Sequence, residues 1–265
     1  MKLAQATLLI IVFVFTLNGC VTTSNSSLSK KADPVAAVER YVQLGLEYIK
    51  RDDLFRARKH ILRALEINED NAPANAALGL ISHQDGEFKE AETLFLKALS
   101  LDETFTRGRT YYGAFLFSQQ RFQESLAQFE LASKDPGYIG RAQIFTNIAL
   151  CNIKLENYDD ALTAYDKTLR LDRSNGRALS GITELLIQQK NYQRGQQYYN
   201  RLVRLIRQQG LQHSAQSLWL GIRIADYFQS EEQKASLVML LENLYPDSNE
   251  YAQYLKREQA RNTDA

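Results

Sequence analysis

The side chains that most often perform chemistry are few and scattered in this 265-residue chain. Its three histidines, His60, His83 and His213, have no Cys, His or carboxylate at a spacing that suits a shared metal ion. The sequence also lacks the glycine-rich phosphate-binding motifs, the nucleophile elbow and the zinc-protease signature. We therefore expect a protein that is not an enzyme, that binds no metal or cofactor and that has no small-molecule substrate.

The two cysteines are too few for a disulfide framework, and they predict different things. Cys151 falls inside an apolar helical segment and is expected to be a small buried residue rather than a reactive thiol. Cys20 follows a basic Lys2 and an apolar run over 6–17. Because a transmembrane helix needs about 20 apolar residues, this run is too short to span a bilayer and is typical of a signal peptide.

The segment LNGC at 17–20 resembles the bacterial lipobox, in which the chain is cut before a Cys that receives lipid. The resemblance implies a lipoprotein signal peptide over 1–19 and lipidation of Cys20, and the alternative is a free Cys after a signal peptide. Val21, in place of Asp, implies by resemblance to enterobacterial sorting a lipid anchor on the periplasmic face of a Gram-negative outer membrane. Residues 20–33 are rich in Ser and Thr, which predicts a flexible tether that spans about 20 Å.

The charges are almost balanced, with 32 Lys and Arg against 31 Asp and Glu. A net charge of +1 gives no broad attraction to phosphate, so we expect no nucleic-acid partner. Arg201, Arg204 and Arg207 nevertheless form a basic stripe on one predicted helix. This stripe is either a solvated convex face or a contact for an acidic partner or lipid head groups.

A period of 34 residues organises the rest of the chain. Each unit contains Leu-Gly or a similar pair, and a small residue follows 12 positions after the second member of that pair. A large apolar residue lies four positions after the small residue, and in most units a second small residue lies three positions beyond it. The small positions that we expect where helices cross closely are Gly45, Ala57, Ala64, Gly79, Ala91, Ala98, Gly113, Ala132, Ala149, Ala161 and Gly221.

This pattern resembles the tetratricopeptide repeat, in which each unit is two antiparallel helices. It predicts an all-α superhelix of about six helix-turn-helix units over 34–255, ending in a C-terminal capping helix near Tyr251 and Tyr254. The remaining residues, 256–265, are expected to be a polar tail.

In tetratricopeptide domains, partners contact fixed positions on the first helix of each unit, along the concave face. Carried onto this register, the resemblance implies a largely aliphatic protein-binding groove that suits an amphipathic helix or a hydrophobic segment. Its residues are Val42, Leu46, Ile49, Leu80, His83, Phe117, Leu150, Ile153 and Ile187. The alternative is that neighbouring helices cover these side chains.

The whole arrangement resembles the PilF/PilW family of tetratricopeptide-repeat lipoproteins of type IV pilus biogenesis, often called pilotins. The segments that carry the resemblance are 41–68, 111–133, 217–228 and 241–255, and the last two lie outside the generic repeat pattern. The resemblance implies a monomeric outer-membrane lipoprotein that binds the type IV pilus secretin and promotes its localisation and multimerisation. The alternative is a scaffold lipoprotein of another periplasmic assembly, for cell-wall hydrolase recruitment or outer-membrane protein assembly.

Overall fold

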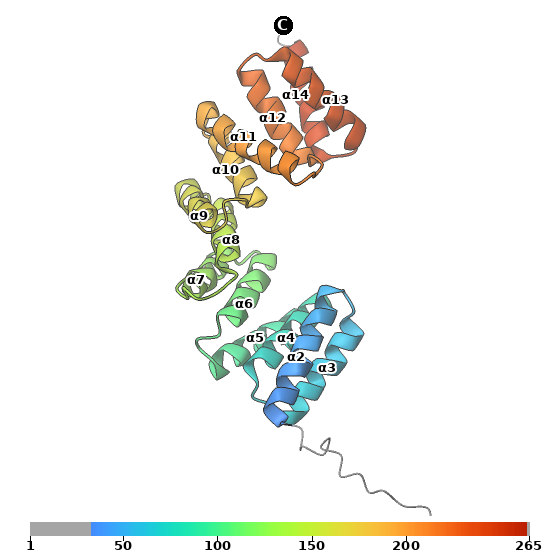
Figure 1. Ribbon diagram of the computed structural model, residues 1–265, viewed down its shortest axis with the longest axis vertical. Coiled ribbons are helices and arrows are strands. Elements are labelled where there is room, and N and C mark those ends of the chain that lie inside the picture. Colours follow the sequence, from blue (N-terminus) through green and yellow to red (C-terminus); the bar gives the residue numbers. More distant parts are fainter. Residues whose placement is uncertain (1–32, 264–265) are drawn as a thin grey trace, which may run out of the picture.

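The computed structural model describes residues 33–263, and over this range the chain is a stack of helices with no strand (Figure 1). The all-α prediction is therefore confirmed. The predicted signal peptide, Cys20 and most of the predicted tether lie outside the described residues. Between 33 and 263, no helix combines the length and the apolar character that a bilayer crossing requires.

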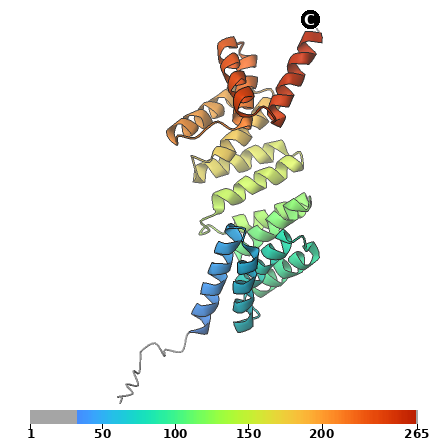
Figure 2. The ribbon, with the colours of Figure 1, turned by 90° about the vertical axis from the view of Figure 1, so that its right-hand side faces the viewer.

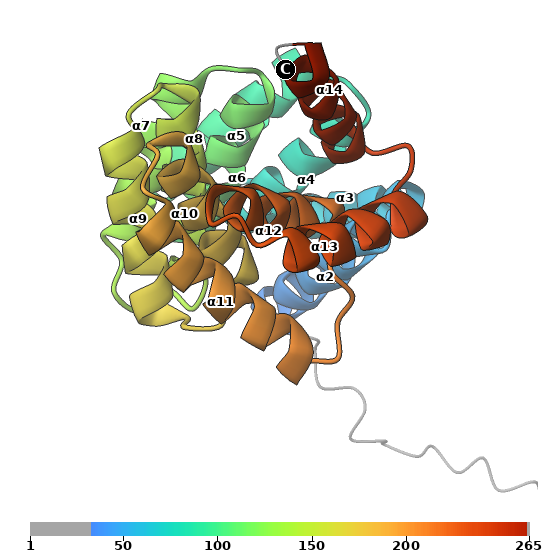
Figure 3. The same ribbon diagram turned by 90° about the horizontal axis from the view of Figure 1, so that it is seen from above.

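The helices follow one another as antiparallel pairs, one pair for each predicted unit (Figure 2). The pairs are α2 (Pro34–Lys50) with α3 (Leu54–Ile67), α4 (Ala72–Gln84) with α5 (Phe88–Leu101), α6 (Thr106–Ser118) with α7 (Phe122–Ser133), α8 (Arg141–Lys154) with α9 (Tyr158–Leu171), α10 (Gly176–Gln188) with α11 (Tyr192–Gln208), and α12 (Ala215–Tyr227) with α13 (Glu231–Leu244). A final helix, α14 (Asn249–Thr263), follows the sixth pair. Seen from above, the pairs wind into a superhelix, with α7, α9 and α11 on its outside (Figure 3).

Polar residues between the units start the helices. The Asn71 side chain accepts a hydrogen bond from the Ala74 backbone N–H at 2.9 Å, and Asn175 accepts one from Ala178 at 3.0 Å. Each cap satisfies a backbone donor that the first turn of a helix leaves without a partner, and its loss costs about 1 kcal/mol. The short connections predicted between units therefore fix where each new pair begins.

The turn inside each pair uses the same backbone device. One residue of every turn adopts a left-handed conformation, and the six are Asp52, Gly86, Gln120, Glu156, Lys190 and Gln229. Only Gly86 is a glycine, and the φ angles of the other five lie between 55° and 61°. A residue with a Cβ pays about 1–2 kcal/mol for this conformation, so the repeat tolerates a local cost in order to reverse the chain tightly.

The predicted small positions are all buried, where paired helices approach closely. A Cβ on Gly45 of α2 would lie 2.6 Å from Ile61 Cγ1 of α3, and one on Gly113 of α6 would lie 3.0 Å from Phe129 of α7. Larger side chains at such positions force helices apart at a cost of about 1–3 kcal/mol. This geometry is the physical reason for the 34-residue spacing of small residues.

The C-terminal end differs from the predicted tail. Residues 256–265 were expected to be a polar extension, whereas α14 continues as a helix to Thr263. Its start is capped by Ser248, whose hydroxyl accepts a hydrogen bond from the Tyr251 N–H at 3.1 Å. The sequence therefore predicts the presence of this capping helix but places its end too early.

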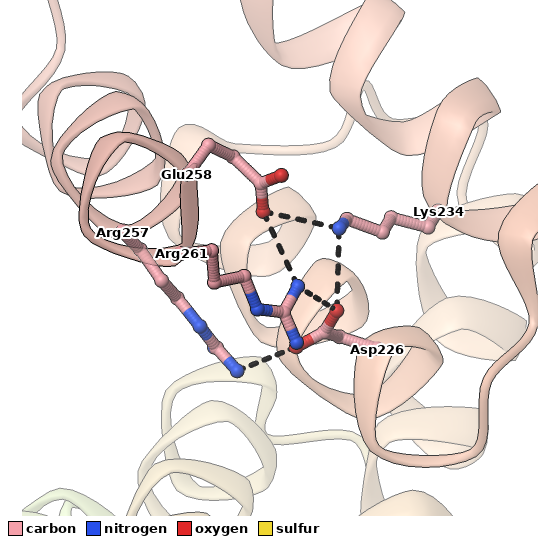
Figure 4. A network of polar contacts seen from close by, with 5 residues as sticks. All are labelled: Asp226, Lys234, Arg257, Glu258 and Arg261. Carbon is pink, nitrogen blue, oxygen red and sulfur yellow. Dashed lines mark hydrogen bonds and ion pairs between the residues drawn. The ribbon is translucent and has the colours of Figure 1, made fainter. Parts of the chain in front are cut away.

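Ion pairs hold the end of α14 against the preceding pair (Figure 4). The Asp226 carboxylate, with only 5% of its side chain exposed, lies 2.5 Å from Arg257, 2.7 Å from Arg261 and 3.2 Å from the Lys234 ammonium. Lys234 also contacts Glu258 at 3.0 Å. Burial alone would raise the pKa of Asp226, but hydrogen bonds from Arg261 and Lys234 outweigh it, and the pKa lies below its ordinary value.

Candidate functional site

A groove opens on the concave face at the N-terminal end of the stack. It has a volume of about 770 Å³ and lies where α4 packs between α2 and α6. We call it the N-terminal groove. Its lining residues are Glu39, Val42, Gln43, Leu46, Glu47, Ile49, Lys50, Asn71, Pro73, Leu80, Arg107 and Tyr111.

The floor of the N-terminal groove is apolar. Leu46 and Ile49 of α2 are half-buried, as are Leu80 of α4 and Tyr111 of α6. Burial raises the pKa of the Tyr111 phenol, which therefore stays protonated at neutral pH. A hollow with an apolar floor and few converging polar groups is typical of a site that accepts an apolar side chain from a ligand.

The rim of the N-terminal groove carries charges of both signs. On the α2 side, the Glu47 carboxylate lies 2.8 Å from the Lys50 ammonium, and this pair holds the pKa of Glu47 below its ordinary value. On the α6 side, Arg107 is exposed. The rim therefore offers both an acidic and a basic contact to a ligand whose apolar face enters the groove.

Four of the predicted groove residues lie together here. Val42, Leu46, Ile49 and Leu80 all line the N-terminal groove, although Val42 is only 7% exposed. Two more, Phe117 and Leu150, line a separate hollow of about 100 Å³ between α6 and α8. The expected continuous strip is therefore divided into two sites, and whether these residues bind a partner stays a prediction.

His83, also predicted in the groove, lines neither hollow. Its Nε2 lies 3.0 Å from the Ser118 hydroxyl, and its ring packs edge-on against Phe115 with 5.4 Å between ring centroids. Burial lowers the pKa of His83, so the imidazole is neutral at neutral pH. Residues 33–263 contain no cluster of side chains that would hold a metal ion.

The last two predicted groove residues are less accessible. Ile153 is half-buried and packs against the central core. Ile187 is 1% exposed, and a Cβ on Gly195 would lie 3.5 Å from its Cγ1. The structure therefore corrects the expected position of Ile187, because α11 covers this side chain and removes it from the concave surface.

Sequence reasoning missed Arg107 and Tyr111 of the N-terminal groove. Glu39, Pro73 and Arg107 are spaced by 34 residues and all line it, so they occupy one recurring place near the start of the first helix of each unit. Including this recurring position of the first helix in the predicted groove would have identified Arg107. Tyr111 lies one helical turn beyond Arg107 on the same face of α6, and that spacing is its signal.

Comparisons with known proteins agree with this architecture. A tetratricopeptide-repeat family model matches residues 42–104 and 153–209. The type IV pilus assembly protein PilF of Pseudomonas aeruginosa is 33% identical over 239 residues, which cover 90% of this chain and 93% of that protein. The chain belongs to the PilF/PilW family. An uncharacterised protein of Haemophilus influenzae is 28% identical over 172 residues, or 65% of this chain and 94% of that protein.

Solved structures of the PilF/PilW family share the fold. The structure of Pseudomonas aeruginosa PilF superposes with a TM-score of 0.77 at 32% identity, over 84% of this chain and 99% of that one. The structure of PilW, described as a type IV pilus biogenesis factor, superposes with a TM-score of 0.71 at 22% identity, over 82% and 98% of the two chains. The family thus spans almost the whole helical stack, including the divergent end.

Proposed function

We propose that this protein is an outer-membrane lipoprotein of type IV pilus assembly that binds the pilus secretin and promotes its localisation and multimerisation. Its relative PilF is named a type IV pilus assembly protein, and the resemblance in sequence extends over most of both chains. The observation that carries the proposal is the N-terminal groove, an apolar hollow open on the concave face of a repeat scaffold.

The chemistry of the N-terminal groove suits a peptide rather than a small molecule. A ligand that lays an amphipathic helix or hydrophobic segment along α2 and α4 covers the floor formed by Leu46, Ile49 and Leu80. Its flanking polar groups then meet Lys50 on one side and Arg107 on the other. A hydrophobic segment of a secretin subunit matches these requirements.

The proposed lipid at Cys20 supplies the second half of the mechanism. Each buried CH₂ of an acyl chain contributes about 0.8 kcal/mol to membrane affinity, so two or three chains give firm attachment. A tethered groove concentrates bound subunits at the membrane surface, and this local concentration favours multimerisation by mass action. The protein thereby escorts the secretin and assists its assembly without catalysing a reaction.

Charged substitutions in the N-terminal groove test the proposal. Leu46→Asp or Leu80→Asp places a carboxylate on the apolar floor and should reduce secretin recovered with the purified protein by about tenfold. Cells that produce either variant in place of the wild type should lose secretin multimers from the outer membrane. Membrane fractionation, followed by electrophoresis of unheated samples, measures the multimers. Fractionation also locates the protein itself.

Leu96→Asp is the matched control, since Leu96 on α5 is 50% exposed and lies outside the N-terminal groove. This variant should bind and assemble secretin as the wild type does. Normal multimers in the groove variants, with normal helical content by circular dichroism, would refute secretin binding by the groove. Recovery of a cell-wall hydrolase or an outer-membrane assembly factor in place of secretin would favour the alternative scaffold role.

A further inference from the structure

The outer face of the fourth and fifth units carries arginines that have no acidic partner. Several arginines elsewhere in the described chain pair with carboxylates, as Arg121 does with Glu92 at 2.7 Å and Arg223 with Glu184 at 2.6 Å. Between 158 and 208, within the described part of the chain, no arginine has a carboxylate oxygen within 4.0 Å. The seven are Arg170, Arg173, Arg177, Arg194, Arg201, Arg204 and Arg207.

Three of these arginines surround one hollow. Arg170 and Arg173, at and just beyond the end of α9, face Arg201 of α11 across a space of about 380 Å³. Arg204 lies one turn further along α11 and is exposed. We call Arg170, Arg173, Arg201 and Arg204 the arginine surface.

The arginine surface is held in place by its neighbours. The Arg201 guanidinium lies over the Tyr198 ring, 5.4 Å from its centroid. The Tyr198 hydroxyl in turn donates a hydrogen bond to Asp166 at 3.3 Å, so the carboxylate that lines the hollow is engaged by a phenol rather than by an arginine. Stacking limits the freedom of Arg201, which lowers the entropy that it loses when it binds an anion.

The balanced net charge of the chain hides a separation of charge. Residues 134–210 carry 12 Lys and Arg against 7 Asp and Glu, whereas residues 33–133 carry 12 against 16. Like charges gathered on one face repel each other, and this repulsion is relieved when an anion binds. The fourth and fifth units are therefore the part of the molecule that attracts a negatively charged ligand.

The side chains around the arginine surface favour a protein ligand over a bilayer. Leu171, between Arg170 and Arg173, is 50% exposed, whereas α11 exposes no large apolar side chain along its length, and a single apolar side chain gives little insertion into a membrane interface. The planar guanidinium pairs with carboxylates in a two-pronged arrangement, and Arg201 and Arg204 are spaced as neighbouring turns of a helix. We propose that the arginine surface binds an acidic peptide segment of a protein partner, on helices other than those of the N-terminal groove and independently of it.

A labelled octaglutamate peptide and the full chain test this proposal by fluorescence anisotropy. Arg170→Glu combined with Arg204→Glu should weaken peptide binding about tenfold, because both changes replace a guanidinium with a repelling carboxylate. Arg170→Lys combined with Arg201→Lys keeps the charge but loses the two-pronged geometry, and should weaken binding about threefold. The Lys variant also serves if the Glu variant fails to fold.

Arg40→Glu on α2 is the matched control, since Arg40 is exposed, has no ion pair among the described residues and lies far from α9 in sequence. It changes the net charge in the same direction and should alter peptide affinity less than about twofold. Equal affinity of the wild type and the arginine variants would overturn the proposal. A second result would also overturn it. If the arginine variants bind the peptide as the wild type does but no longer sediment preferentially with phosphatidylglycerol over phosphatidylcholine vesicles, the surface binds the membrane.

Discussion

The two ends of the stack place charged and apolar side chains in opposite ways. At the N-terminal groove, Leu46 and Leu80 face the open concave surface while Glu47 and Lys50 stay on its rim. At the C-terminal end, the Asp226 carboxylate is buried beneath α14 and meets three cationic side chains. One end therefore exposes apolar surface, and the other encloses charge.

The difference follows from the demands of a repeat scaffold. Each helix pair buries its faces against the next pair, so the first and last pairs each have one face without a repeat to cover it. Here α14 covers the last pair, with Tyr251 and Tyr254 packed against the cluster that contains Trp219. Among the described residues, no helix covers the first pair in the same way, and the N-terminal groove beside it lies on the concave face between α2, α4 and α6, where an accessible apolar hollow suits a partner.

The largest effect should come from breaking the closed end. Asp226→Ala leaves the charges of Lys234, Arg257 and Arg261 without their shared carboxylate and should lower the free energy of unfolding by about 3–5 kcal/mol. Chemical denaturation measures the loss, and hydrogen exchange should show faster opening of α14. Glu66→Ala, which removes an exposed partner of Arg63, should cost less than about 1 kcal/mol.

The pH dependence of the same variant gives an independent check. The pKa of Asp226 is lowered in the folded protein, so its contribution is present above the unfolded pKa and is lost as the pH falls through the folded pKa. The wild type should therefore lose this share of its stability only in strong acid, and Asp226→Ala should not show that step. A variant as stable as the wild type at neutral pH would contradict a stabilising role for the network.

A smaller effect tests whether Ile187 belongs to the secretin-binding surface. Ile187→Ala removes a side chain that is 1% exposed and should destabilise the fold by about 2–4 kcal/mol through the cavity it leaves. Because α11 covers Ile187, secretin binding at a temperature where the variant is folded should match that of the wild type. A loss of binding as large as that of Leu46→Asp would return Ile187 to the contact surface.

The smallest effect tests a feature that both ends share. Asp52 beside α2 and Gln229 beside α12 adopt left-handed φ angles of 59° and 55°. Replacing either by glycine should raise stability by about 0.5–1 kcal/mol, since the relief of strain exceeds the added freedom of the unfolded chain. Thermal unfolding measures the gain. If only one of the two glycine variants is less stable than the wild type, the side chain replaced in that variant makes a stabilising contact.

The repeat architecture could be predicted because it depends on contacts at short sequence separation. Gly45 packs on Ile61, and Gly113 packs on Phe129, each 16 residues away. The same separation recurs in successive units, so the small residues record the pairing directly in the sequence. The number of pairs and the positions of their turns follow from that record.

The parts that could not be predicted depend on contacts between distant or divergent segments. Asp226 meets Arg257 and Arg261 only after α14 folds back on α12, and in the sequence these residues look like ordinary polar side chains. Register alone also assigns Ile49 and Ile187 to the same face. Ile187 is nevertheless 1% exposed and lies against the first turn of α11 at Gly195, whereas Ile49 is half-buried beside the N-terminal groove.

The nearest-neighbour packing of the stack has a mechanical consequence. Each helix contacts only helices close to it in the chain, and α2 contacts α3 and α4. A pulling force applied at Pro34 therefore acts on α2 before it reaches any later pair, because among the described helices α2 packs chiefly on α3 and α4. Since α2 also forms one wall of the N-terminal groove, tension in the preceding segment would deform this hollow first and leave the distant helices at rest.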